Sequence, residues 1–420
     1  MTTNWAGNIT YRAQEVHRPS SVAELQAVVA RSRRIRPLGT RHSFNDLADS
    51  PGALVSVTGL PPSVELDTRR ATGRATARVP AGMRYAELTR HLDERGFALP
   101  SLGSLPHISV GGACATATHG SGVRNGCLAA SVSALDLVTA EGDLITVARG
   151  DERFDGMVVG LGALGVVTHL TLDLVPAYEM RQQVYKGLPL DALDDHFGEL
   201  VSSAYSVCLF TDWSAPRLTQ IWIGERLDEP PADVAKLPWF TALSADGPCH
   251  PVDGMPAASC TEQLGVPGRW HERLPHFRPD HEPSSAGDEL HSEYMIARAD
   301  AVSALHALDA VRDRIRPVLQ ICEVRTIAAD RLWMSPFYEA DSVSVHFTWT
   351  SDTAAVLPVV RLVEERLAPF AARPHWAKIF TMEPPELRRL FPRLADFARL
   401  AGDCDPKGKF ASPFLDRYLR

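Results

Sequence analysis

A disulfide framework and a zinc-binding pattern are both missing from this 420-residue chain. Its seven cysteines are odd in number, are spread from Cys114 to Cys404, and form no Cys-x-x-Cys pair. Cysteines at short, regular spacing would indicate one of these sites, and the chain has no such set. We therefore expect reduced, buried thiols and no bound metal.

Long apolar runs are missing as well. The most apolar stretch, 156–170, falls short of a membrane span, is rich in glycine and contains His169. The N-terminal residues show no basic segment followed by an apolar one, so no signal peptide is predicted. We expect a cytoplasmic protein that makes no contact with a membrane.

Positive charge is in deficit, since 43 Lys+Arg stand against 51 Asp+Glu and give a formal net charge of −8. This balance excludes a general affinity for nucleic acid. The only basic cluster, four arginines within 31–36, follows a helix that the Ser21-x-x-Glu24 capping box predicts over 21–30. We interpret the cluster as cations that complement the dipole at a helix C-terminus, rather than as a phosphate-binding patch.

Thirty-one prolines and 29 glycines argue for many short elements and against a long-helix bundle. In the first 178 residues, two helices are predicted over 21–30 and 85–94, and Glu141-Gly142-Asp143 predicts a hairpin turn. Short β-rich runs surround them at 34–36, 53–57, 75–79, 132–138, 144–148 and 166–174. The pattern is typical of an α+β fold with sheets of modest size.

Beyond residue 178 the pattern changes. Two long proline-rich connections, 225–240 and 247–287, come before two predicted strands, 319–328 and 342–349, and a helix over 354–367. We interpret this part of the chain as a second domain, with the two proline-rich connections forming long loops around it.

Alternation along these two strands gathers polar side chains. Glu323 and Arg325 are two residues apart and share one face, as do Ser344, His346 and Thr348. If the strands are neighbours, these groups supply the donors and acceptors that a polyol needs. An exposed sheet face with a cross-strand ion pair is the alternative.

Two glycine-rich segments favour a bound ligand. Gly160–Gly165 spells G-x-G-x-x-G, but a helix-like segment precedes it and a β-branched one follows, the reverse of the dinucleotide fingerprint. We expect its glycines to allow a sharp turn close to something flat. The segment 101–126 interleaves glycines with Ser and Thr, so its backbone N–H groups can line a pyrophosphate. Leu105, Ile108 and Val110 argue against the alternative, a flexible surface loop.

A third segment, Gly39–Asn45, places His42 in a Gly/Ser turn, where a histidine is by itself more often structural than functional. Taken together, four segments resemble motifs of the vanillyl-alcohol-oxidase superfamily of FAD enzymes and follow the family order. They are Gly39–Asn45, Thr116–Gly122, Leu161–Val167 and Asp405–Phe410. Two more, Ser104–Val110 and Pro374–Lys378, are similar to the alditol oxidases in particular.

The resemblance implies a two-domain α+β fold of the FAD-linked oxidase type. An FAD-binding domain would comprise 1–178, a substrate or cap domain 179–374, and the segment 375–420 would complete the first domain. The implied activity is oxidation of the terminal CH–OH of an alditol such as xylitol or sorbitol to the aldose, with O2 reduced to H2O2. The implied partners are the polyol and O2, with no nucleic acid or membrane, and a monomer is expected.

Two alternatives stay open. An aldonolactone or other carbohydrate oxidase or dehydrogenase could occupy the same scaffold. A carbohydrate-binding protein without flavin is the alternative from outside the enzymes.

The resemblance also implies roles for particular residues. His42 would carry FAD covalently, as a neutral imidazole attacking the flavin 8α-methyl carbon. The catalytic residues would be Arg325, Lys378, Glu323 and His346, and the substrate would contact Ser104, Glu323, Arg325, Thr348 and Lys378. The cofactor would contact Gly39, Thr40, Arg41, His42, Ser43, Ser104, Ser109, Gly112, Thr116, Ala117, Thr118, His119, Gly165 and Val167.

Two residues depart from the family pattern. Arg41 replaces the small residue usual before this histidine, and Ala117 replaces a glycine. Arg41 would either crowd the covalent linkage or add positive charge near the isoalloxazine.

Overall fold

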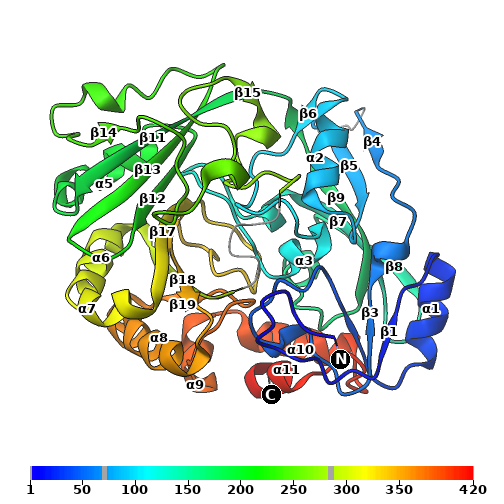
Figure 1. Ribbon diagram of the computed structural model, residues 1–420. Coiled ribbons are helices and arrows are strands. Elements are labelled where there is room, and N and C mark those ends of the chain that lie inside the picture. The colour runs from blue at the N-terminus through cyan, green and yellow to red at the C-terminus, as the bar shows by residue number, and fades with distance from the viewer. Residues whose placement is uncertain (1, 69–72, 282–287, 420) are drawn as a thin grey trace.

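Two β-rich units lie next to each other in the computed structural model, which describes residues 2–68, 73–281 and 288–419 (Figure 1). The last six residues of the predicted connection 247–287 lie outside the described residues. Among the described residues, every helix is too short or too polar to cross a membrane. All seven cysteines are free, and all but the partly exposed Cys404 are buried, as predicted.

The first unit contains three small sheets. An antiparallel sheet has the strand order β4-β5-β9-β7-β8, a parallel one has the order β1-β3-β2, and β6 pairs with β10. The strands are β1 (Glu15–His17), β2 (Ile35–Pro37), β3 (Ala53–Val55), β4 (Glu65–Asp67), β5 (Thr76–Pro80), β6 (Phe97–Ala98), β7 (Val132–Val138), β8 (Leu144–Ala148), β9 (Val166–Asp173) and β10 (Val175–Pro176). The helices are α1 (Val22–Arg31), α2 (Tyr85–Asp93), α3 (Val110–Ala115) and α4 (Phe154–Met157).

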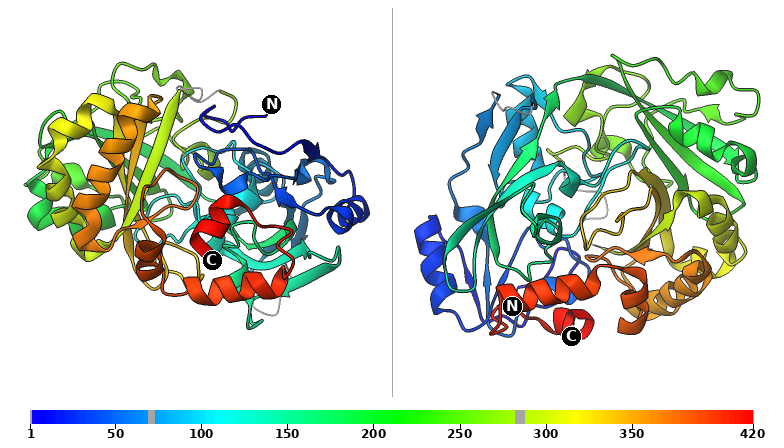
Figure 2. Two further views of the ribbon diagram at one scale, coloured as in Figure 1. Left: turned by 90° about the horizontal axis from the view of Figure 1, so that it is seen from below. Right: turned by 180° about the vertical axis from the view of Figure 1, so that it is seen from behind.

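The second unit is built on one large sheet with the order β14-β11-β13-β12-β17-β18-β16-β19, and β15 also pairs with β11. Its strands are β11 (Glu179–Pro189), β12 (Ser206–Thr211), β13 (Arg217–Arg226), β14 (Leu243–Ser244), β15 (Gly268–Arg269), β16 (Glu289–Ala297), β17 (Leu319–Ile327), β18 (Ser342–Thr350) and β19 (Arg373–Pro374). The helices α5 (Ala192–Ser202), α6 (Ala301–Asp309), α7 (Arg312–Ile315) and α8 (Thr353–Leu367) cover its outer face (Figures 1 and 2). The other face is turned toward the first unit.

Local sequence signals account for the elements that were predicted. The hydroxyl of Ser21 accepts the backbone N–H of Glu24 at 3.2 Å and begins α1, while the Glu24 carboxylate reaches back to Ser20 instead of Ser21. Gly142, with φ of +94°, makes the predicted hairpin between β7 and β8, because a left-handed φ costs glycine little. The predicted strands 319–328 and 342–349 are confirmed as β17 and β18, and they are neighbours.

Four long strands were not predicted: β11, β12, β13 and β16. In β11 the buried side chains alternate as expected for a strand, but the buried position between Met180 and Val184 is held by the polar residue Gln182. Polar residues that point inward break the hydrophobic alternation by which a strand is recognised. The same applies to β16, where Glu289 and Glu293 are buried.

The chain's last residues dock onto the first unit. After α9 (Pro384–Leu390) and α10 (Leu394–Cys404), the Asp405 carboxylate accepts the backbone N–H groups of Lys409 and Phe410, at 2.8 and 2.6 Å. The Lys409 ammonium then donates to the carbonyl of Val29 in the last turn of α1, at 2.7 Å. The last helix, α11 (Pro413–Leu419), packs against the short 3-10 helix Asp46–Ala48 of the first unit.

Arg36 corrects the interpretation of the basic cluster. It is not a cation at the end of α1 but a buried residue of β2, only 1% exposed. Its guanidinium donates to the carbonyls of Gly162, Leu161, Phe410 and Leu47 at 2.5–2.9 Å. One side chain thereby joins the 160–165 turn, the C-terminal segment and the residues after the 39–45 loop. Burial lowers the pKa of Arg36 to about 10, so it stays charged at neutral pH.

Replacing Arg36 is therefore predicted to destabilise the fold. Arg36→Met should lower the free energy of unfolding by about 3–5 kcal/mol, because several buried carbonyls lose their donor at roughly 1–3 kcal/mol each. Denaturant unfolding followed by circular dichroism measures this change. Arg33→Met, at an exposed position of the same cluster, serves as the control and should stay within about 0.5 kcal/mol of wild type. Equal effects of the two substitutions would contradict the assigned role.

Candidate active site

A single cavity of about 340 Å³ is lined by both units. Its wall in the first unit is formed by the loops 39–44, 103–119 and 160–167 and by apolar residues of β7 and β9, among them Leu135 and Leu170. In the second unit it is lined by polar residues of β16, β17 and β18 and by the segment 375–378. The cavity therefore has one mostly apolar, glycine-rich part and one part crowded with charged groups.

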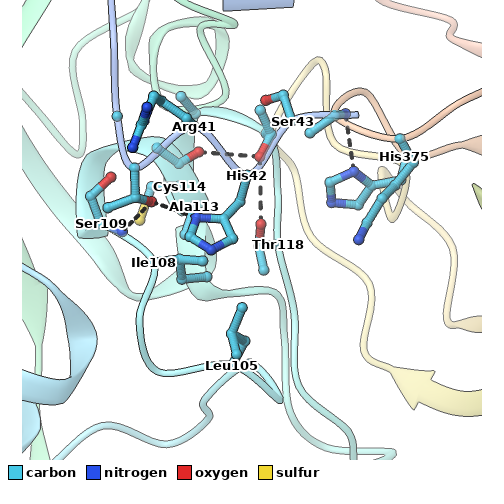
Figure 3. A pocket seen from close by; sticks show the side chains of 18 of the residues that line it. Arg41, His42, Ser43, Leu105, Ile108, Ser109, Ala113, Cys114, Thr118 and His375 are labelled. Atoms are coloured by element: carbon cyan, nitrogen blue, oxygen red, sulfur yellow. Dashed lines mark hydrogen bonds between the residues drawn. The ribbon is translucent and has the colours of Figure 1, made fainter. Parts of the chain in front are cut away.

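The loop 39–45 presents His42 to the cavity (Figure 3). The His42 Nδ1 atom lies 3.0 Å from the hydroxyl of Thr40, which also accepts the backbone N–H of Ser109. The ring of Trp5 stacks on that of His42 with 5.3 Å between centroids. Burial, aided by the positive charge of Lys378, lowers the pKa of His42 to about 3, so the imidazole is neutral at physiological pH.

The two departures from the family pattern share one backbone property. Arg41 has φ of +68° and Ala117 has φ of +56°, the left-handed region that favours glycine. The Arg41 guanidinium donates to the carbonyl of Thr3 at 3.2 Å, and its side chain points in another direction from the His42 ring (Figure 3). Arg41 thus does not crowd the imidazole.

Glycine is required where backbone segments meet at the cavity wall. A Cβ atom built on Gly39 or on Gly112 would lie 2.9 Å from the hydroxyl of Ser109. Gly165, with φ of +153°, would place a Cβ 2.7 Å from the carbonyl of Val138. These contacts let backbone, rather than side chains, form this part of the wall.

The strands β17 and β18 bring the predicted substrate residues together. Antiparallel pairing sets Glu323 opposite His346 and Arg325 opposite Ser344. Arg325 donates to the hydroxyl of Ser104 at 3.1 Å and lies 3.5 Å from His346 Nδ1. Among the described residues, the atoms Glu323 Oε1 and Arg325 Nε have no hydrogen-bond partner, although they are 3.4 Å apart. Both residues line the cavity, where a carboxylate and a guanidinium suit a ligand that offers hydroxyl groups.

Three residues of β16 belong to the same polar wall and were missed: Glu289, His291 and Glu293. They alternate with Leu290, Ser292 and Tyr294, and this period of two was the available signal. Pairing with β18 places Glu293 opposite His346 and His291 opposite Thr348.

Glu293 is the shared acceptor of this region and is buried. Its Oε1 atom lies 2.9 Å from His119 Nε2, 2.5 Å from the Ser344 hydroxyl, 3.4 Å from Arg325 Nη2 and 3.7 Å from His346 Nδ1. Burial by itself would raise the pKa of Glu293, but its interactions with His119, His346 and Arg325 outweigh this effect and hold the pKa well below the usual 4.5. Glu293 is therefore an ionised carboxylate in the folded protein.

Lys378 reaches the site because β19 pairs with β16 and the chain continues along that edge. The backbone N–H of Ile379 donates to the carbonyl of His291 at 2.8 Å, and the Lys378 Nζ atom lies 2.8 Å from His291 Nδ1. The Asn45 side chain donates to the carbonyl of Lys378 at 2.8 Å, which ties this segment to the loop that holds His42. Burial lowers the pKa of Lys378 to about 8.

A segment of the second unit closes the cavity over Ser104. The backbone N–H groups of His276 and Phe277 both donate to the Ser104 carbonyl, at 3.1 and 3.2 Å. Cys208, His276 and Glu323 offer ligand atoms within 4.8 Å of one another, a spacing that a metal ion could use. Arg325, whose Nε atom is 3.4 Å from Glu323, places a fixed positive charge against a cation there.

The predicted cofactor residues all line the cavity except Ala117, which is fully buried behind it. The predicted substrate and catalytic residues line it as well. His119 reaches the cavity, but its Nδ1 and Nε2 atoms are each 2.9 Å from a protein oxygen, on Gly120 and Glu293. Ser344 lies beneath the wall, bonded to Glu293.

The residues present fit an FAD molecule. A wall made of backbone and apolar side chains suits a flat ring system, and a neutral histidine faces it. The fold and the site together define an FAD-binding oxidoreductase with a separate place for a small polar substrate.

Known proteins give the same class. Residues 13–148 match the model of the FAD-binding domain, and 288–418 match that of D-arabinono-1,4-lactone oxidase. The chain is 53% identical to the alditol oxidase of a Streptomyces species, over 99% of this chain and 98% of that protein. It is 28% identical to the L-gulono-1,4-lactone dehydrogenase of Mycobacterium tuberculosis and 25% identical to the L-gulonolactone oxidase of Bos taurus, each over 99% of this chain and at least 97% of the relative. The chain belongs to the alditol oxidase family of vanillyl-alcohol-oxidase-type flavoproteins.

A solved structure agrees on the fold. The cholesterol oxidase of B. sterolicum superposes with a TM-score of 0.79 at 14% identity, covering 100% of this chain and 96% of that one.

Glu293 should control the stability of the site in a pH-dependent way. Glu293→Gln should lower the free energy of unfolding at pH 7 by about 3–5 kcal/mol, because Arg325 loses a buried counter-charge. Since the folded pKa of Glu293 lies below 4.5, its contribution is complete above pH 4.5 and is lost as the pH falls further. The difference between variant and wild type should therefore narrow below pH 4.5.

Urea unfolding at pH 7, 5 and 4 measures this difference. Glu179→Gln, at an exposed position of the same large sheet, is the control and should not differ from wild type at any of the three values. A Glu293→Gln deficit that stays constant with pH would refute the ion-pair account.

Proposed function

We propose that this protein is an FAD-dependent alditol oxidase, which oxidises the terminal CH–OH of a sugar alcohol such as xylitol or sorbitol to the aldose and reduces O2 to H2O2. The observation that carries this proposal is the single cavity that holds His42 in its glycine-lined part and Arg325 and Lys378 in its polar part. The 53% identity to an alditol oxidase supports this substrate class, whereas the two gulonolactone enzymes are 25–28% identical.

FAD would be held by the loops 39–44, 103–119 and 160–167, and when bound it accepts a hydride and passes the electrons to O2. His42 would carry it covalently. Support comes from the neutral imidazole, because only the unprotonated ring has a lone pair to attack an electrophilic methyl carbon.

The substrate would occupy the polar part of the cavity. Arg325, as a cation, and Lys378, through its N–H groups, would stabilise the negative charge that develops on the substrate oxygen, since both side chains are held in place by neighbouring groups. Glu323, which lines the cavity, would accept hydrogen bonds from hydroxyl groups of the polyol, and Ser104, His346 and Thr348 would complete the contacts.

The same proposal assigns FAD binding and substrate binding to different domains. Residues 1–178 with 375–420 would bind FAD, and 179–374 would form the substrate domain. The bonds of Asp405 and Lys409 with the first unit support the assignment of the C-terminal segment. We also propose a cytoplasmic monomer, and the seven free thiols agree with a reducing compartment.

The activity has a direct test. Xylitol or sorbitol added in air should release one H2O2 for each polyol oxidised, with kcat/KM at least about tenfold above that for L-gulono-1,4-lactone, a difference of about 1.4 kcal/mol in transition-state binding. Peroxidase-coupled absorbance measures the product. A preference for the lactone would favour the alternative, an aldonolactone oxidase, and reduction of a dye without peroxide would indicate a dehydrogenase.

Covalent attachment has a separate test. After acid precipitation the flavin absorbance should stay with the wild-type protein and should be released from His42→Ala. His306→Ala, which changes an exposed histidine of α6, should retain the flavin as wild type does. Release of the flavin from wild-type protein would show that the bond does not form.

A further inference from the structure

Three side chains form a continuous row of hydrogen-bonding groups along the wall of the polar part of the cavity. The Nζ atom of Lys378 lies 2.8 Å from Nδ1 of His291, and Nε2 of His291 lies 2.8 Å from Oε1 of Glu289. Both distances are those of strong hydrogen bonds, and all three side chains line the cavity. Glu289 begins β16, directly after the exposed Asp288. The row therefore ends at Glu289, whose side chain is 9% exposed.

The orientation of His291 is fixed by its neighbours. A carboxylate accepts hydrogen bonds, so the nitrogen beside Glu289 carries the N–H and Nδ1 offers its lone pair to Lys378. His346 Nε2, 3.1 Å away, faces the same lone pair. The ring of Phe44 stacks on His291 at 4.2 Å and holds it in this plane. Burial, followed by the charge of Lys378, lowers the pKa of His291, which keeps the ring neutral and able to accept a proton.

Charged and titratable groups surround Lys378 on every side. Glu289, His291 and Glu293 face it from β16, and Glu323 and Arg325 from β17. His346 faces it from β18, and His42 and His375 from the two adjoining loops. Burial and Arg325 favour the neutral amine, while Glu293, Glu289 and Glu323 favour the charged ammonium.

We infer that Lys378, His291 and Glu289 form a proton relay that removes the hydroxyl proton of the polyol. The inference rests on the proposed function. As the carbinol C–H bond breaks, its electron pair leaves as hydride to the bound FAD. The substrate O–H bond breaks at the same stage, its electrons form the C=O bond, and its proton joins the neutral Nζ of Lys378. Lys378 then passes a proton to His291 Nδ1 while the Nε2 proton of His291 moves to Glu289, which releases it to solvent.

Lys378 is thus the proton acceptor, and His291 and Glu289 are positioning residues that act through it. The neutral amine is required, so the rate of substrate oxidation should rise with pH through the Lys378 pKa of about 8. If Glu289 only tuned that charge, its removal would favour the neutral amine and speed the reaction at pH 7. A relay makes the opposite prediction, because the proton then has no exit.

The test uses the FAD-loaded protein in anaerobic rapid mixing with saturating xylitol, with flavin bleaching as the measure of substrate oxidation. Glu289→Gln should lower the limiting rate roughly 10²-fold, as expected for loss of general base catalysis. Competitive acylation of Lys378 followed by mass spectrometry gives a second measure that does not depend on turnover. Its pH midpoint should fall in Glu289→Gln, since a negative charge near the ammonium is lost.

His291→Gln provides a second variant and should slow the reaction to a similar extent. Asp288→Asn, at the exposed residue that immediately precedes β16, is the matched control and should change neither the rate nor the acylation midpoint. A slower reaction together with a lower acylation midpoint in Glu289→Gln supports the relay.

Two outcomes overturn it in distinguishable ways. If wild type is bleached by xylitol and Glu289→Gln and His291→Gln keep its rate, the relay is refuted and the proposed function stands. If xylitol does not bleach wild type at any pH, the proposed function is refuted and the relay falls with it.

Discussion

The negative charge of Glu293 is buried and therefore needs partners that balance it. Much of the site follows from this requirement. His119 comes from the glycine-rich segment of the first unit, whereas Arg325 and Ser344 come from neighbouring strands of the second. All three point at the same oxygen. Bringing them together fixes the position of the glycine-rich segment relative to the large sheet. Arg325, held in place by Glu293, donates a hydrogen bond to Ser104 at the cavity wall.

Charge in the cavity is arranged so that His291 and His346 stay neutral while Glu293 stays ionised. Arg325 and Lys378 lie among Glu289, Glu293 and Glu323, so positive and negative groups are interspersed in the polar part of the cavity. Burial and the charge of Lys378 lower the pKa of His346 and of His291. Neutral imidazoles can accept protons and hydrogen bonds, which charged ones cannot. The same field lowers the pKa of His42 at the other part of the cavity, where a neutral ring is what nucleophilic attack requires.

Direct hydrogen bonds connect the two parts of the cavity. Phe44 donates its N–H to the carbonyl of Ala377, and Asn45 donates to the carbonyls of Trp376 and Lys378. The loop that presents His42 and the segment that presents Lys378 are therefore joined by several hydrogen bonds. Arg36 extends this framework by joining the 160–165 turn to the C-terminal segment. His42 and Lys378, far apart in sequence, are thereby kept at a fixed separation.

The helix that begins at Ser21, the hairpin at Gly142 and the family resemblance could be predicted from the sequence, because caps, hairpin glycines and motif order are local properties. It also identified the polar faces of β17 and β18, since alternation along one strand needs no partner. Tertiary structure alone decided that these strands pair, that β16 adds Glu289, His291 and Glu293 beside them, and that β19 carries Lys378 to the same wall. Such contacts depend on strand pairing and on the mutual neutralisation of buried charges. For the same reason Arg36, one of four arginines in a basic run, became a buried structural residue rather than a surface cation.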